Sequence, residues 1–155
     1  MKMTPEHLEI SINTEGKIYA IVPSIPRLYK YGIYIFYHKN RLIRIGETAS
    51  GFTRIYKGFS SPLRLKNGKK NYYAYSWRQD YRNEKIRVVY FSLDQLDKEA
   101  EKPEVRRSIE AEIAFQIRLK SEKWPVRMTE IHFSEKLRSN RKIKTVVNEI
   151  VESIV

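Results

Sequence analysis

Two neighbouring runs of β-branched and aromatic residues constrain the fold of this chain more than any other feature. They are residues 32–37 (GIYIFY) and 41–46 (RLIRIG), and the polar residues His38, Lys39 and Asn40 separate them. Residues of these types favour β-strands, and a short polar segment between two such runs is typical of a tight turn. The sequence therefore predicts a β-hairpin over residues 32–46.

Further segments have strand character. Residues 8–12 and 17–22 surround a turn signal at residues 13–16 (NTEG), and residues 86–91 (IRVVYF) are expected to add a third strand to the core. Residues 129–133 (TEIHF) are also strand-like. These segments predict a small, mainly antiparallel sheet.

Helical spacing of apolar residues predicts two longer helices. One begins near Pro103, ends before residues 124–125, and repeats apolar residues at Val105, Ile109, Ile113 and Ile117. The other is an amphipathic helix over residues 140–155, with one apolar face formed by Ile143, Val146, Val147, Ile150, Val151 and Ile154.

Two shorter helices are indicated by their capping residues. Ser50 is a suitable N-cap for a helix that ends near Gly58, and Ser92 or Asp94 can cap a helix that runs to Ala100. Together the segments predict an α/β (α+β) fold, in which helices flank a three-stranded core sheet. A chain of 155 residues with 41% apolar residues suits one domain of this kind.

The composition excludes several kinds of site. The chain has no cysteine, and its three histidines are scattered, so disulfides, thiolate nucleophiles and cysteine zinc sites are excluded. A catalytic metal would need oxygen ligands. Neither a membrane-spanning run nor the apolar core of a signal peptide is visible, so we expect a soluble, cytoplasmic protein.

Positive charge is concentrated in one part of the chain. Thirty Lys and Arg residues against eighteen Asp and Glu give a formal charge of +12, and residues 54–87 carry ten of these cations interleaved with aromatic residues. Cations contact phosphates and aromatic faces stack on bases, so nucleic acid is the expected partner, ahead of a membrane surface or a merely solvated basic face. The candidate nucleic-acid-binding residues are Lys57, Arg64, Lys66, Lys69, Lys70, Trp77 and Arg78.

The predicted hairpin resembles that of the GIY-YIG nuclease family. Residues 32–34 (GIY) are followed, after nine residues, by residues 44–46 (RIG), in which Arg44 replaces the second motif tyrosine. Arg54 lies ten positions beyond Arg44, which is similar to the family's spacing to its catalytic arginine. Glu110 stands between apolar residues much as the family's metal-binding glutamate does, and Glu112 is the alternative.

The resemblance covers residues 31–118, which leaves residues 1–30 as an N-terminal strand extension and residues 119–155 as a C-terminal extension. It implies that Tyr34 orients or deprotonates the attacking water, that Arg54 clamps the scissile phosphate, and that Glu110 holds Mg²⁺ or Mn²⁺. Arg44 cannot act as a base, but it can donate hydrogen bonds to phosphate. Each residue also has an ordinary interpretation, as a strand tyrosine, a surface arginine or an exposed helix carboxylate.

The expected function is therefore metal-dependent cleavage of DNA, and RNA stays open as a substrate. A GIY-YIG-like domain that binds nucleic acid without cutting it is one alternative. A basic interaction protein is another, and its C-terminal helix would dock on a partner or on a second copy of the chain. Restriction, repair and mobile-element roles fit the scaffold equally well.

Overall fold

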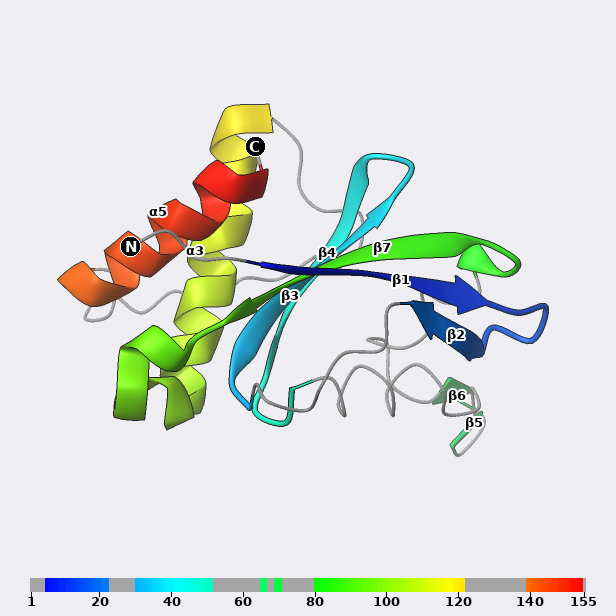
Figure 1. Cartoon of the computed structure of the whole chain (residues 1–155), viewed down its shortest axis with the longest axis horizontal. Helices are drawn as coiled ribbons and strands as arrows, with labels where there is room; N and C mark the ends of the chain where they lie inside the picture. The colour runs from blue at the N-terminus through cyan, green and yellow to red at the C-terminus, as the bar shows by residue number, and fades with distance from the viewer. Residues whose placement is uncertain are drawn as a thin grey trace.

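The computed structural model describes residues 5–22, 30–51, 65–66, 69–70, 80–121 and 139–154. Within them the elements follow in the order β1 (Glu6–Ile12), β2 (Ile18–Val22), β3 (Gly32–His38), β4 (Arg41–Thr48), β5 (Leu65–Lys66), β6 (Lys69–Lys70), β7 (Lys85–Ser92), the 3-10 helix η2 (Asp94–Glu101), α3 (Pro103–Ser121) and α5 (Arg141–Ile154) (Figure 1).

Five of the strands form one antiparallel sheet, in the order β2-β1-β7-β3-β4. This confirms the α+β class and the antiparallel pairing. The expected three-stranded core needs correction, because the N-terminal strand pair is part of the same sheet and β1 pairs along β7. The register explains the pairing, since it aligns Leu8 with Val88 and Ile10 with Ile86, so that apolar side chains of both strands share one face.

The β3–β4 hairpin forms where the sequence predicts it, with a tighter turn than expected. His38 belongs to β3 and pairs with Arg41, so only Lys39 and Asn40 form the loop. Both have positive φ angles, 48° and 67°, as the favoured two-residue hairpin turns require. A bulge between Phe36 and Tyr37 then shifts the register further along the hairpin.

α3 and α5 lie together against one face of the sheet (Figure 1). The four residues that predicted α3 are buried there, in one cluster with Ile33 and Ile35 of β3. Five of the six residues on the predicted apolar face of α5 are buried in the same cluster, and Ile154 packs against it. α5 of the C-terminal extension is thus part of the main core, and self-association through this helix stays a prediction.

The opposite face of the sheet carries a second apolar cluster, which includes Tyr34 and Phe36 from β3 together with residues from β1, β2, β4 and β7. A sheet with both faces buried explains the nearly continuous apolar run over residues 32–37, since all six of these residues are buried.

The remaining predictions have mixed outcomes. The short helix after β7 is present as η2, which Asp97 interrupts with a φ of 51°. The predicted cap was wrong, because Leu93 is the N-cap residue and no side chain caps the helix, although the Ser92 hydroxyl accepts a hydrogen bond from the Asp94 N–H at 3.3 Å. The predicted helix that ends near Gly58 and the strand at residues 129–133 lie outside the described residues. Among the described helices, none combines the length and the apolar character that crossing a bilayer requires.

If α5 belongs to the core, truncating its central residue must destabilise the whole domain. Ile150 has no exposed surface, so we expect Ile150→Ala to lower the free energy of unfolding by about 2–5 kcal/mol in urea titrations. Glu152→Ala, at an exposed position of the same helix, should change it by less than about 0.5 kcal/mol. Equal stability of Ile150→Ala and the parent protein would show that α5 does not pack as described.

Candidate active site

Tyr34 lies in the middle of the sheet, on the face opposite α3. In register it stands between Gly46 of β4 and Tyr90 of β7. Its side chain is 5% exposed, and its ring is 5.0 Å from that of Phe36, at an angle of 42°. The packing therefore holds the ring in one orientation. A catalytic phenol requires this, but an ordinary core tyrosine is held in the same way.

The two glycines of the hairpin motif make room for tyrosine rings. A Cβ atom on Gly46 would lie 2.1 Å from Cζ of Tyr34 and 2.2 Å from its hydroxyl oxygen. On Gly32, a Cβ atom would lie 2.2 Å from the hydroxyl oxygen of Tyr90. The Tyr34 ring thus crosses β4 at Gly46, two residues from Arg44. The role of Gly46 in making room for the Tyr34 ring was not predicted from the sequence, although the pairing of Gly46 opposite Tyr34 in the hairpin could have indicated it.

Replacing Gly46 tests this close approach. Gly46→Ala should force the Tyr34 ring to move and lower the free energy of unfolding by about 1–3 kcal/mol, measured by urea denaturation. In a Tyr34→Leu background the same change should cost clearly less, because the colliding ring atoms are gone. An equal cost in both backgrounds would contradict the described packing.

Arg44 lies in β4, one of the two edge strands of the five-stranded sheet. It pairs in register with Phe36, which places it on the face that carries Tyr34. Because β4 is an edge strand in the described sheet, a long side chain on it can act on groups beyond the edge. Arg44 acts electrostatically on the carboxyl of Glu110 in α3.

Glu110 is partly buried, and its burial raises the pKa of the carboxyl from the ordinary 4.5 to about 7. Arg44 opposes this pKa shift, Glu47 of β4 adds to it through like-charge repulsion, and Arg107 of α3 opposes it. Charged groups from both β4 and α3 therefore lie close enough to act electrostatically on the Glu110 carboxyl. Glu47 and Arg107 were not predicted as site residues.

Glu112 has different surroundings. Two residues along an α-helix amount to a rotation of about 200°, so Glu112 leaves α3 on the side away from Glu110. It is 8% exposed and lines a cavity of about 520 Å³ between α3 and α5, together with Gln116, Ile143 and Val147. Of the two glutamates considered from the sequence, Glu110 is therefore the one beside Arg44.

The donor atoms near Glu110 fit a divalent cation of the Mg²⁺ type only in part. Among the described residues, no three His, Asp or Glu side chains gather closely enough to enclose a metal ion. One oxygen of Glu47 is already bonded to Arg106, which leaves Glu110 as the principal carboxylate. Mg²⁺ commonly binds one or two carboxylates and completes its shell with water and substrate phosphates, so this donor set suits an ion that arrives with a phosphodiester.

The other predicted site residues are not placed. Arg54, Lys57, Arg64, Trp77 and Arg78 lie outside the described residues. For Lys66, Lys69 and Lys70, the structure gives only the backbone pairing of β5 with β6. At the described end of the basic segment, the guanidinium carbon of Arg87 lies 4.6 Å from the ring centre of Tyr37 in β3.

No protein-family model, curated protein or solved structure matches the chain.

The raised pKa of Glu110 predicts how stability changes with pH. Between pH 4.5 and about 7 the folded protein keeps a proton that the unfolded chain has released, so stability falls as pH rises through this window. Glu110→Gln carries no charge to bury, and without divalent ions it should raise the melting temperature at pH 8 by at least about 2 °C and leave it unchanged at pH 4.5.

Glu104→Gln is the matched control, since Glu104 is an exposed carboxylate in the first turn of the same helix. Its removal should not stabilise the protein at pH 8, because a negative charge at that end of a helix is favourable. If Glu110→Gln and Glu104→Gln behave alike at pH 8, the Glu110 carboxyl is not desolvated as described.

Proposed function

We propose that this protein is a metal-dependent endonuclease that hydrolyses DNA phosphodiester bonds in the cytoplasm by a GIY-YIG-like mechanism. The feature that supports it most is the nearness of Arg44 in β4 to Glu110 in α3, close enough for the guanidinium to lower the pKa of the Glu110 carboxyl. These residues lie far apart in the sequence and in different elements, and the resemblance implied one site for both.

Arg44 and Glu110 have complementary roles in the proposed reaction. Glu110, once ionised, holds Mg²⁺ or Mn²⁺, which when bound polarises the phosphate and stabilises the leaving 3′ oxygen. Arg44 donates hydrogen bonds to the non-bridging oxygens and offsets the negative charge that builds up on them. Arg54 would supply the second cationic group that clamps the phosphate.

Tyr34 is proposed to orient the attacking water. Its ring is held across Gly46, on the face of the sheet that Arg44 shares in register, whereas α3 with Glu110 covers the opposite face. The proposed reaction therefore needs a phosphate that reaches both groups around the edge strand β4. Positioning of this kind lowers the entropic part of the barrier, because the nucleophile does not have to search for its angle of attack.

The basic segment is proposed to bind the DNA backbone. The charge of +12 favours a polyanion, and the seven candidate residues between Lys57 and Arg78 combine phosphate-binding cations with a stacking surface. Contacts of this kind fix the position of the duplex but do not read its sequence.

A second candidate function is nucleic-acid binding without cleavage. The observation that favours it is the pair of guanidinium groups, Arg44 and Arg107, that act on Glu110. Two positive charges beside the only proposed metal ligand oppose the binding of a divalent cation. A domain with this balance of charges would still hold phosphates well.

Nicking of supercoiled plasmid by the purified protein, with Mg²⁺ or Mn²⁺, separates the two. We expect metal-dependent nicking, and a loss of at least about 100-fold in Glu110→Gln and in Arg54→Ala, because each removes transition-state charge stabilisation. Glu104→Gln, on the same helix as Glu110, should cut like the parent protein.

Three outcomes decide among the functions. Salt-dependent DNA binding with no cleavage in any metal would select the binding function. Cleavage of RNA alone would retain the mechanism and change the substrate. Neither cleavage nor salt-dependent binding would reject both nucleic-acid functions and leave the basic interaction protein.

A further inference from the structure

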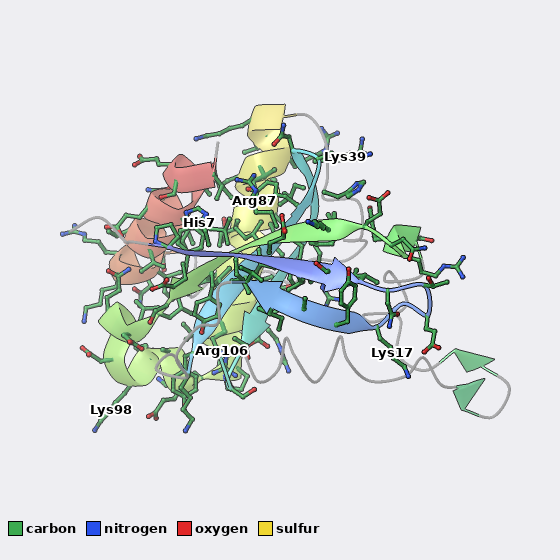
Figure 2. All side chains as sticks on the ribbon, turned by 45° about the vertical axis from the view of Figure 1, so that its right-hand side comes forward. His7, Lys17, Lys39, Arg87, Lys98 and Arg106 are labelled. Carbon is green, nitrogen blue, oxygen red and sulfur yellow. The ribbon has the colours of Figure 1, made fainter. Side chains whose placement is uncertain are left out.

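One buried guanidinium ties together three parts of the fold beside the proposed site. Arg106 of α3 is 5% exposed (Figure 2). Its Nε donates to Oε2 of Glu47 in β4 at 2.6 Å, and its Nη1 donates to the carbonyl of Ala100 in η2 at 2.8 Å. Its guanidinium carbon also lies 5.3 Å from the ring centre of Tyr31, just before β3.

These contacts hold the end of the β3–β4 hairpin. The carbonyl of Tyr31 accepts the N–H of Leu93, and the carbonyl of Lys30 accepts the N–H of Gly51, both at 2.9 Å. Lys39, at the turn of the hairpin, lies at the opposite end from Arg106 (Figure 2). The anchored end is therefore the one from which the chain continues toward Arg54.

Glu47 and Arg106 flank the proposed site on both elements. Glu47 is three residues beyond Arg44, about 10 Å along a strand. Arg106 is four residues before Glu110, about 6 Å along a helix and roughly one turn. Because the ion pair joins β4 to α3 this close to Arg44 and Glu110, any slip of the strand along the helix would change the spacing between them.

A guanidinium suits this task better than an ammonium group would. Its planar fork serves two acceptors in different directions at once, whereas the single head group of lysine cannot reproduce that geometry. Loss of the bond to Glu47 would also leave a mostly buried charge without its partner, which is costly, so the arrangement resists displacement.

We propose that Arg106 is a positioning residue that sets the spacing between Arg44 and Glu110 by anchoring Glu47 of β4 to α3. This proposal rests on the proposed nuclease function as far as the reaction is concerned, and its structural part stands apart from it. Arg106 touches neither substrate nor metal in this scheme.

The first test is kinetic. Arg106→Lys keeps the charge and loses the fork, so we expect kcat for plasmid nicking to fall by about 10-fold to 100-fold while KM for DNA changes little, as for a misplaced catalytic group. Arg141→Lys, at an exposed position of α5, is the matched control and should cut like the parent protein. A parental kcat in Arg106→Lys would overturn the proposal.

The second test does not depend on cleavage. Because the chain lacks cysteine, Ala49→Cys and Glu104→Cys, both at exposed positions, can be spin-labelled specifically at the end of β4 and the start of α3. Pulsed electron–electron double resonance should give a narrow distribution of distances between the two labels. After Arg106→Lys is added, we expect this distribution to become broader or to shift. An unchanged distribution would overturn the anchor.

These measurements keep the two proposals distinguishable. If the parent protein cuts no DNA, the nuclease function fails, and the spin-label distances alone decide whether Arg106 sets the spacing. If Arg106→Lys does not fold, Glu47→Gln takes its place, since the amide oxygen still accepts a hydrogen bond but the ion pair is lost. Glu47→Gln should then broaden the distance distribution, and an unchanged distribution would overturn the proposal.

Discussion

The candidate site depends on the contact between edge strand β4 and helix α3. β4 contributes Arg44 and Glu47, and α3 contributes Arg106 and Glu110, so the proposed chemistry requires these elements to keep their spacing. The apolar cluster between the sheet and the two helices provides most of the packing that holds α3 against the sheet. The buried ion pair of Arg106 and Glu47 fixes how the two elements are aligned, because a hydrogen-bonded ion pair has a preferred geometry, whereas apolar contacts depend little on direction.

The charges at this contact are balanced against one another. Glu110 is buried enough to hold its proton near neutral pH, and it is flanked by cations that favour its ionised form. A phosphodiester would bring negative charge to Arg44 and Arg107, and a divalent cation would bring positive charge to Glu110. The phosphodiester would therefore neutralise the positive charges of the site and the cation its negative charge. Binding of either one should thus favour binding of the other.

Local patterns predicted the elements well and the sheet less well. The spacing of apolar residues and the turn residues predicted the β3–β4 hairpin, β7, α3 and α5, because each of these patterns lies within a single segment of the sequence. The five-stranded sheet depends on β1 pairing with β7, some 80 residues away, and no local pattern encodes which edge a hairpin joins. In the site, helical spacing did not show whether Glu110 or Glu112 faces Arg44, and no local pattern predicted that Glu47 pairs with Arg106. Both depend on which part of the sheet α3 packs against.

Carbon-detected NMR titration of the Glu110 carboxyl, in the parent protein and in Arg44→Gln, tests the account most directly. If Arg44 and Glu110 meet at the edge of β4, the parent carboxyl titrates with a pKa of about 7, and loss of the guanidinium raises that pKa further. A Glu110 carboxyl that titrates at 4.5 and does not respond to the change at Arg44 would contradict the account.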